Sequence, residues 1–304
     1  MHLVITDSGL GGLSVCAKLV SLLKENSIPG NTKFPFEYLK ITYINAAPSN
    51  TFGYNSIQNN SEKILMFKKF ISNTKKIFNP NYIFVACGTL SVLLNELQNK
   101  ENYSCKIEGI IPIGEKILLE NLNNNPKANV IIFGTPTTIS SKVFQELLYN
   151  NGISKERIFT QSCPKLANKI SNDKNGLKVS REIHNFVKKS LIKLPSNQKT
   201  PLIAFLACTH YAFRENFFYN SFKLEGQKDF RVLNPNISSA KNLRNLIWAD
   251  LQPYKFKSME ISIEFVSTYS IPKREENTLS KLLYVTSPET VMALKNAKIC
   301  TELI

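Results

Sequence analysis

Seven short apolar runs are the feature that most constrains the fold of this chain. They occupy residues 3–6, 41–44, 82–86, 109–111, 130–133, 202–207 and 282–285, and segments of helical length lie between them. Runs that are apolar on both faces are typical of strands buried in a parallel sheet. The pattern therefore predicts an α/β fold. Ligands of such folds bind beyond the carboxyl ends of the strands, so the residues that follow each run are the candidates for chemistry.

Length and composition are those of a globular protein with room for one large or two modest domains. The chain has 304 residues, of which 43% are hydrophobic and 20% are charged. No apolar stretch reaches the roughly 18 residues of a membrane span, and no basic segment precedes the first run. We therefore expect a cytoplasmic protein with no membrane partner.

The six cysteines are scattered, with no CxxC pair, and there are only three histidines. This distribution fits neither a disulfide framework nor a zinc site, so we expect reduced thiols and no metal.

A formal net charge of +15 raises the alternative of a nucleic-acid-binding protein. The lysines are spread over many segments, often beside asparagines, and no zinc finger or basic-aromatic sheet motif accompanies them. A solvated Lys/Asn-rich surface is the simpler interpretation, and nucleic acid is not an expected partner.

Two of the runs end alike, which indicates an internal repeat. Residues 83–89 read IFVACGT and residues 203–210 read IAFLACTH, so Cys87 and Cys208 each follow an apolar run directly. The first and fifth runs also end in small polar turns, at 6–9 and 134–138. A duplicated α/β unit with a cleft between its copies would bring the two cysteines face to face.

A glycine-rich turn, Asp7-Ser-Gly-Leu-Gly-Gly12, follows the first run and opens a helix with apolar residues at 13, 16, 19, 20 and 23. Glycines at a helix start let backbone N–H groups approach an anion. The order is not that of a dinucleotide or Walker motif, so a carboxylate is the more fitting ligand. A tight turn with Asp7 as helix cap is the structural alternative.

The two cysteines at strand ends are candidates for proton transfer. A free cysteine is commonly a small buried hydrophobe, and we interpret Cys16 in that way. Cys87 and Cys208 differ because following amides and polar neighbours can lower a thiol pKa and favour the thiolate. One thiolate would remove the proton from an α-carbon while the other thiol returns a proton to the opposite face.

Such chemistry needs no metal, but without pyridoxal phosphate the carbanion must be stabilised by hydrogen bonds to the substrate carboxylate. Hydroxyl groups at strand ends can supply these bonds. They belong to Ser8, Thr89, Thr135, Thr138 and Thr209.

Four ordered motifs resemble those of the glutamate racemase family, in the aspartate/glutamate racemase superfamily. They are residues 7–13 (DSGLGGL), 86–91 (ACGTLS), 134–141 (GTPTTISS) and 208–211 (CTHY), with weaker echoes at Phe52-Gly53, Cys163-Pro164 and 284–289. The resemblance implies two Rossmann-like parallel-sheet domains related by pseudo-twofold symmetry, with the active site in the interdomain cleft. We place the first domain at 1–95 plus 212–304 and the second at 96–211.

The resemblance also implies cofactor-independent racemisation of L-glutamate to D-glutamate for peptidoglycan and the cell wall. Cys87 and Cys208 would be the acid/base pair, assisted by Asp7 and His210. The residues that would bind a small amino-acid substrate are Ser8, Phe52, Gly53, Gly88, Thr89, Thr135, Thr138 and Thr209. The oligomeric state stays open, with a homodimer as one candidate.

Three positions depart from the family pattern and bear on the substrate. Gly88 stands where the family has asparagine, Phe52 where it has tyrosine, and Ser171 near where an acidic residue often follows Cys-Pro. The alternatives are therefore a racemase or isomerase of aspartate, another amino acid or a related carboxylate, or a non-catalytic binding protein. We expect Gly88→Asn to raise glutamate turnover if the pocket still accepts glutamate. Segments 24–36 and 250–276 are interpreted as surface loops away from the chemistry.

Overall fold

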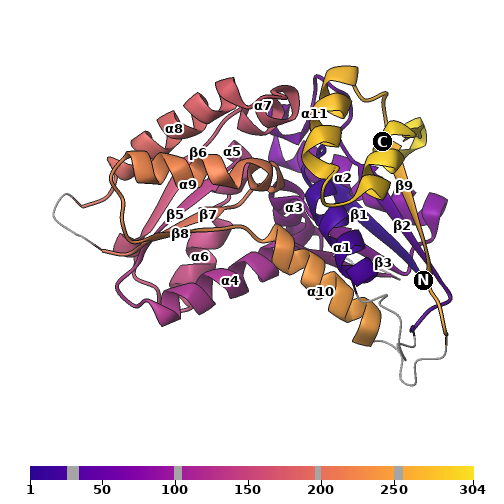
Figure 1. Ribbon diagram of the computed structural model, residues 1–304, viewed down its shortest axis with the longest axis horizontal. Coiled ribbons are helices and arrows are strands. Elements are labelled where there is room, and N and C mark those ends of the chain that lie inside the picture. The colour runs from indigo at the N-terminus through magenta and orange to yellow at the C-terminus, as the bar shows by residue number, and fades with distance from the viewer. Residues whose placement is uncertain (26–33, 99–104, 196–199, 250–255) are drawn as a thin grey trace.

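The computed structural model describes residues 1–25, 34–98, 105–195, 200–249 and 256–304, and these form two lobes side by side (Figure 1). Each lobe is built on one sheet, and all strand pairs within both sheets are parallel. The first sheet has the order β10-β9-β2-β1-β3-β4 and the second has the order β6-β5-β7-β8. The strands are β1 His2–Asp7, β2 Tyr38–Asn45, β3 Tyr82–Val85, β4 Lys106–Gly109, β5 Asn129–Gly134, β6 Ile158–Ser162, β7 Leu202–Leu206, β8 Phe230–Leu233, β9 Glu260–Ser267 and β10 Lys298–Ile299.

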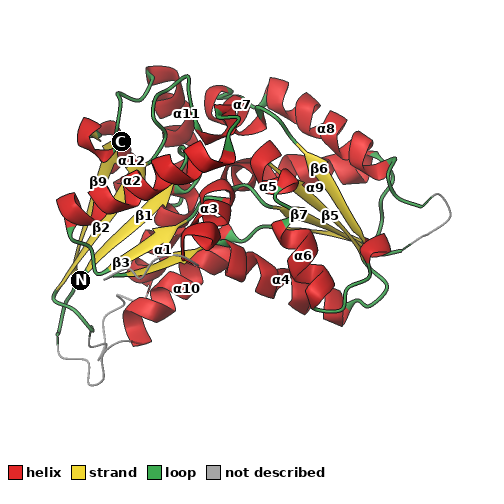
Figure 2. Ribbon diagram, turned by 180° about the vertical axis from the view of Figure 1, so that it is seen from behind, coloured by secondary structure: helices red, strands yellow, loops and turns green. Residues whose placement is uncertain are grey.

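Helices cover both faces of each sheet (Figure 2). They are α1 Leu13–Glu25, α2 Asn60–Phe78, α3 Gly88–Gln98, α4 Ile111–Asn124, α5 Pro136–Ser140, α6 Val143–Asn150, α7 Leu166–Asn172, α8 Leu177–Leu191, α9 Glu215–Leu224, α10 Asn236–Ala249, α11 Lys273–Leu283 and α12 Pro288–Lys295. Alternate residues of the central strands enter separate cores: Leu3 and Ile5 pack on one face of β1, and Val4 packs on the other. This explains why the runs are continuously apolar.

The two lobes repeat one strand order. In the first sheet β2-β1-β3-β4 are neighbours, and in the second β6-β5-β7-β8 follow the same sequence of positions. The strands that precede Cys87 and Cys208 are β3 and β7, which occupy equivalent places. The predicted class, two parallel-sheet domains related by pseudo-twofold symmetry with a cleft between them, is confirmed.

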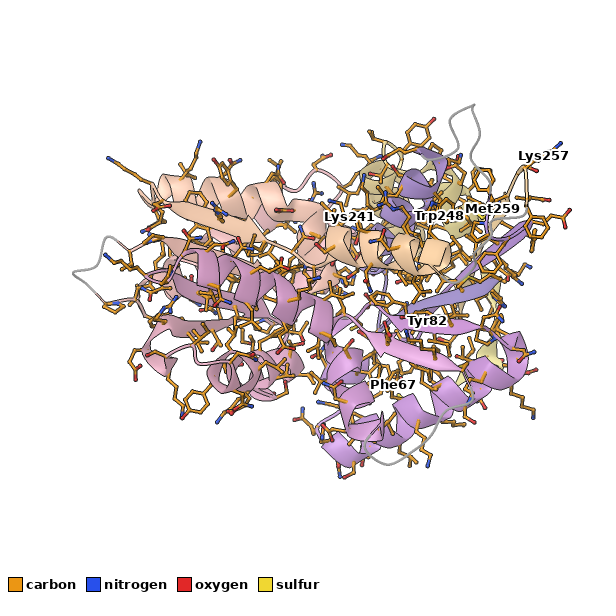
Figure 3. The ribbon with its side chains drawn as sticks, turned by 90° about the horizontal axis from the view of Figure 1, so that it is seen from below. Phe67, Tyr82, Lys241, Trp248, Lys257 and Met259 are labelled. Atoms are coloured by element: carbon orange, nitrogen blue, oxygen red, sulfur yellow. The ribbon has the colours of Figure 1, made fainter. Side chains whose placement is uncertain are left out.

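In each lobe, one helix follows a strand of the other lobe's sheet. Helix α4 follows β4 of the first sheet, yet its Leu118 and Leu122 lie in a core of the second lobe. Helix α10 follows β8 of the second sheet, yet it packs on α1, and its Leu243 and Ile247 join the first lobe. Figure 3 shows α10, which carries Lys241 and Trp248, running along the first lobe.

The chain passes twice from one lobe to the other, and strand pairing places both passages later than the expected domain boundaries at 95 and 211. Strand β4 pairs with β3 in the first sheet, and β8 pairs with β7 in the second. Both are short edge strands with incomplete burial, so their apolar signal is weak. The chain changes lobes between Gly109 and Ile111 and again after Leu233.

Two sequence interpretations near the C-terminus are wrong. Residues 282–285 do not form a strand: Leu283 ends α11 and is buried on the same helix face as Leu279, while Val285 lies exposed beyond the helix. Segment 250–276 is not a loop throughout, because β9 and the start of α11 lie in it. Strand β9 is only partly buried, since the two-residue β10 is its outer neighbour, and this obscured its pattern. Residues 26–33 and 250–255 of the two expected loops lie outside the described residues.

In the described part of the chain, no helix is long and apolar enough to cross a bilayer.

Candidate active site

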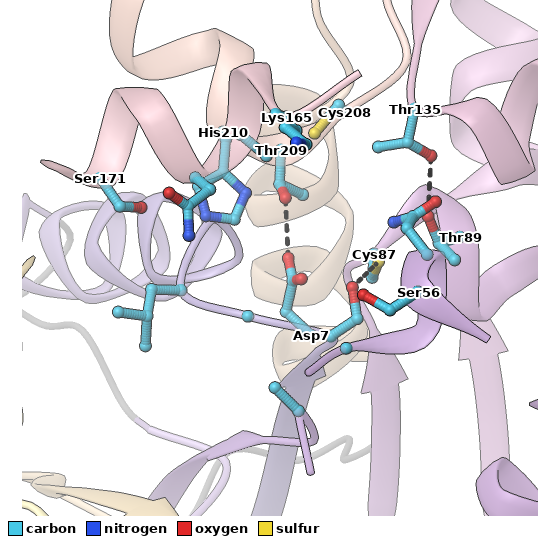
Figure 4. A pocket seen from close by; sticks show the side chains of 18 of the residues that line it. Asp7, Ser56, Cys87, Thr89, Thr135, Lys165, Ser171, Cys208, Thr209 and His210 are labelled. Carbon is cyan, nitrogen blue, oxygen red and sulfur yellow. Dashed lines mark hydrogen bonds between the residues drawn. The ribbon is translucent and has the colours of Figure 1, made fainter. Parts of the chain in front are cut away.

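A cavity of about 600 Å³ lies between the lobes, at the carboxyl ends of their strands. All of the predicted site residues except Thr138 line it, and Thr138 contacts the lining through a hydrogen bond to Thr135. Figure 4 shows Cys87 and Asp7 on one side of this space and Cys208, Thr209 and His210 on the other. The strand ends have therefore brought the predicted residues together.

Cys87 is held at the junction of β3 and α3. Its side chain is 6% exposed, and its Sγ lies 3.0 Å from Ser8 Oγ, which belongs to the turn after β1. Backbone N–H groups of Ser8 and Leu90 also face the sulfur and act to lower the pKa of Cys87. The sulfur is thus presented by two neighbouring strand ends of one sheet.

Cys208 is the equivalent residue of the second lobe. It follows β7, precedes the 3-10 turn Thr209–Arg214, and is 7% exposed. Backbone N–H groups of His210 and Tyr211 face its sulfur and act to lower its pKa. Each lobe therefore supplies one thiol with backbone donors around it.

The expectation of depressed thiol pKa values is wrong for the protein in this structure. Burial raises the pKa of Cys87 to about 12, and the nearby charge of Asp7 acts in the same direction. Burial also raises the pKa of Cys208 well above its ordinary value, and Cys87 and Asp7 add to the effect. Desolvation outweighs the backbone donors, so both groups are thiols at neutral pH.

Asp7 connects the two lobes. It ends β1, is buried, and its Oδ2 accepts a hydrogen bond of 2.7 Å from Thr209 Oγ1 (Figure 4). His210 is buried as well, and burial lowers its pKa while Asp7 acts to raise it. The neutral imidazole, which lies two residues after Cys208, can accept a proton, and the imidazolium so formed can return it.

The glycine-rich turn serves lobe contact. A Cβ at Gly11 would lie 2.3 Å from Thr209 Oγ1 and 2.4 Å from His210 Nδ1. Glycine is therefore required at this position for the second lobe to approach. The sequence predicted an anion site at this turn and did not predict the contact between the lobes.

Gly88 makes a similar contact beside the thiols. A Cβ there would lie 2.6 Å from the carbonyl oxygen of Ala207, the residue before Cys208. An asparagine at this position would force the two strand ends apart. This contact argues against the expectation that Gly88→Asn raises glutamate turnover, because the segments must shift to make room for an amide side chain.

Hydroxyl groups form a chain across the cleft. Thr89 and Thr135 lie 2.9 Å apart between their Oγ1 atoms, and Thr135 and Thr138 lie 3.0 Å apart. Thr89 belongs to the first lobe and the other two to the second. Phe52 and Gly53 line a further wall, where the Phe52 side chain is 44% exposed. The hydroxyl chain can bind a carboxylate whose position depends on both lobes.

Sequence reasoning missed several residues of the cavity wall. The most important is Glu275 of α11, and the others include Tyr269, Lys165 and Lys169. Glu275 falls in the segment expected to lie away from the chemistry, and that expectation is wrong. The signal that was present is a pair of adjacent glutamates in the first turn of an amphipathic helix. Among the described residues, no group of three or more His, Cys, Asp or Glu side chains could hold a metal ion.

Two parallel α/β lobes that share a cleft, with a cysteine at the equivalent strand end of each, define the class of two-domain racemase folds. Solved structures of this fold include the glutamate racemase isoform RacE1 of Bacillus anthracis, with a TM-score of 0.68, 20% identity and coverage of 92% of this chain and 93% of that one. Another is the glutamate racemase of Francisella tularensis in complex with D-glutamate, with a TM-score of 0.68, 17% identity and coverage of 99% and 97%.

Sequence relatives show the family. A glutamate racemase of Clostridium botulinum strain Langeland is 30% identical over 215 residues, which are 69% of this chain and 70% of the relative. That of Campylobacter concisus is 27% identical over 244 residues, or 78% and 77%. No protein-family model matches the chain. The chain belongs to the glutamate racemase family and is an amino-acid racemase, an isomerase.

Proposed function

We propose that this protein interconverts L- and D-glutamate without a cofactor, with Cys87 and Cys208 as the two proton-transfer groups. The observation that carries the proposal is the placement of two buried thiols at equivalent strand ends around one cavity. Each thiol has a polar residue of its own lobe nearby, Asp7 for Cys87 and His210 for Cys208. The D-glutamate produced would serve peptidoglycan synthesis.

The proposed reaction transfers one proton from the substrate and returns another to the opposite face. One sulfur, as thiolate, takes the α-proton, and the electron pair is delocalised into the carboxylate, which the threonine hydroxyls bind. The other thiol then protonates the α-carbon. Because burial raises the pKa of both thiols, the thiolate must form together with substrate binding, when donors and charges of the substrate enter the cavity. The thiol proton would pass to the polar neighbour of the same lobe, Asp7 for Cys87 or His210 for Cys208.

A second candidate keeps this chemistry but changes the amino acid. Gly88 offers no side-chain amide to a substrate, and the structure leaves no room for one. Phe52 has no phenolic hydroxyl, and a carboxylate of Glu275 lines the cavity. These features favour a substrate other than glutamate if turnover of glutamate is low. Circular dichroism of the purified protein with a panel of L- and D-amino acids distinguishes the two candidates.

The two-thiol mechanism is tested by separating the two proton transfers. Serine hydroxyls are far too weakly acidic to act as bases near neutral pH, so Cys87→Ser and Cys208→Ser should each lower racemisation by several orders of magnitude. Elimination of chloride from β-chloroalanine needs only one base: the α-proton leaves, the electron pair forms the double bond, and the enamine hydrolyses to pyruvate and ammonia. By resemblance to the glutamate racemase family, Cys87 would act on the D-isomer and Cys208 on the L-isomer. We therefore expect Cys87→Ser to retain elimination from the L-isomer and Cys208→Ser to retain it from the D-isomer.

Pyruvate formation from each enantiomer is the measurement, and Cys300→Ser, which removes a half-buried thiol that does not line the cavity, is the control. Racemisation at the parent rate in either cavity variant, or loss of elimination from the same enantiomer in both, would show that the opposed thiols do not share the reaction.

A further inference from the structure

Helix α11 places two adjacent buried glutamates at the edge of the cleft, and they have different surroundings. Glu276 forms an ion pair of 2.7 Å with Lys273. Glu275, which is 9% exposed, lines the cavity, and no cation of the described residues lies within ion-pair distance of it. One buried carboxylate is thus neutralised by the protein, and the other faces the space that receives the substrate.

The second lobe holds Glu275 in position. Asn172, the last residue of α7, donates from Nδ2 to Glu275 Oε1 over 2.8 Å. The neighbouring Arg274 donates from Nε to the carbonyl oxygen of Asn172 over 2.7 Å, which fixes the two helices against each other. Figure 1 shows α7 and α11 side by side where the two lobes meet. The described hydrogen bonds leave Glu275 Oε2 without a donor.

Polar groups are unevenly distributed in the cavity. The carboxylates that line it, among the described residues, are Asp7 and Glu275, and Asp7 already accepts the hydroxyl of Thr209. The linked hydroxyls of Thr89 and Thr135 form one end (Figure 4). Ser171, adjacent to the residue that holds Glu275, lies on the other side of His210 in the same view. The threonine hydroxyls and the α7 side of the wall, against which Glu275 is held, therefore lie on opposite sides of the thiols and the imidazole in this view.

Two lysines also line the cavity without neutralising Glu275. Lys169 forms an ion pair of 2.5 Å with Glu182 outside the cavity, and Lys165 is an exposed residue of the wall. A buried carboxylate without a cationic partner is costly, and a ligand that brings the missing cation recovers part of that cost.

We propose that Glu275 binds an ammonium group of the amino-acid substrate and so helps to determine which substrates the cavity accepts. The inference rests on the proposed racemase function. The α-ammonium group and a side-chain ammonium group share the required chemistry, since both donate charge-assisted hydrogen bonds to a carboxylate. Glu275 is a binding residue in this scheme and transfers no proton.

The test compares ligands that differ only in an ammonium group. D-glutamate is paired with glutarate, which lacks the α-ammonium group, and L-ornithine is paired with L-norvaline, which lacks the side-chain ammonium group. Calorimetric titration measures the binding of all four to the parent protein, to Glu275→Gln and to Glu276→Gln. The glutamine at 275 can still accept from Asn172 but carries no charge, and Glu276→Gln is the control for loss of a neighbouring buried carboxylate.

We expect Glu275→Gln to weaken the ammonium-bearing member of at least one pair about tenfold and to change its partner less than twofold. A loss for glutamate but not for glutarate, with ornithine and norvaline weakened alike, assigns the α-ammonium group. A loss for ornithine but not for norvaline assigns the side-chain group. Glu275→Asp, which retracts the charge by one methylene, is the second variant. It should weaken the same ammonium-bearing ligand as Glu275→Gln does and change its partner less than twofold.

Equal weakening of both members of each pair, or no weakening, would overturn the inference, as would a parent protein that prefers neither ammonium-bearing ligand. The two proposals fail separately. Selective loss of amino-acid binding in Glu275→Gln supports the inference even if the parent protein does not racemise glutamate, whereas racemisation with unselective binding removes the inference alone.

Discussion

Single residues of this site owe their properties to burial more than to local sequence. The amides after Cys87 and Cys208 suit a thiolate, yet desolvation dominates and raises the pKa of both thiols. Gly11 and Gly88 suit a ligand-binding turn, yet the atoms next to them belong to the opposite lobe. The sequence correctly placed these cysteines and glycines at the site. The tertiary structure shows that burial and contact between the lobes, which the sequence did not predict, determine their properties.

The raised pKa predicts slow alkylation of Cys87 by iodoacetamide in the absence of substrate. The thiolate is the reactive form, so a pKa of about 12 should lower the rate at neutral pH by about three orders of magnitude relative to an ordinary thiol. The rate should rise about tenfold per pH unit from pH 7 to 10 without a plateau. Mass spectrometry of the peptide containing Cys87 measures it, with far-UV circular dichroism to verify folding. A plateau near pH 8 would contradict the raised pKa.

Gly88→Ala should lower kcat/KM for racemisation at least tenfold, because its methyl group would lie 2.6 Å from the carbonyl oxygen of Ala207 and push the two thiol-bearing segments apart. Gly53→Ala is the matched variant on the same cavity, since a Cβ there meets no atom within 4 Å, and it should have a much smaller effect. Steady-state racemisation assays give both values. Similar effects of the two substitutions would show that the contact between Gly88 and Ala207 does not control the site.

At the scale of elements, β9 supports the site from within the first sheet. It pairs with β2 along its whole length, and its Phe265 stacks on Tyr43 of β2 at a ring distance of 5.4 Å. The hydroxyl of Tyr43 donates to the carbonyl oxygen of Gly9 over 2.7 Å. A strand from the last fifth of the chain thus braces the turn that carries Asp7 and Ser8.

Phe265→Ala should lower the free energy of unfolding by about 3–5 kcal/mol, the usual cost of removing a fully buried aromatic ring. Ile299→Ala in β10 removes a side chain that is 58% exposed and should change the free energy by less than about 0.5 kcal/mol. Urea unfolding followed by circular dichroism measures both. If the two variants were equally stable, β9 would not be part of the core.

At the scale of the whole molecule, the exchange of α4 and α10 decides what each lobe contains. The second lobe is continuous from α4 to β8, and its core includes Phe218 and Phe222 of α9. The first lobe needs segments from both ends of the chain, since α10 packs on α1 and β9 pairs with β2. We therefore propose domains of 1–110 plus 234–304, and 111–233.

The fragment 111–233 should fold alone and unfold cooperatively in urea, because it holds the complete second sheet and its covering helices. The fragment 96–211 lacks α9 and β8, so the apolar face around Phe133 would be exposed, and it should aggregate or show no cooperative transition. Circular dichroism and size-exclusion chromatography of the two fragments measure this. Cooperative unfolding of the shorter fragment alone would favour the earlier boundaries.

The sequence by itself determined the parallel α/β class, the internal repeat and the positions of Cys87 and Cys208, because each depends on residues close together in the chain. It could not locate β9, since a half-covered strand has a weak apolar pattern. Tertiary structure alone decided the raised thiol pKa, the contact of Gly88 with Ala207 and the presence of Glu275 in the cavity. These depend on desolvation and on segments that meet only after the chain has crossed twice between the lobes, and local sequence carries no record of either.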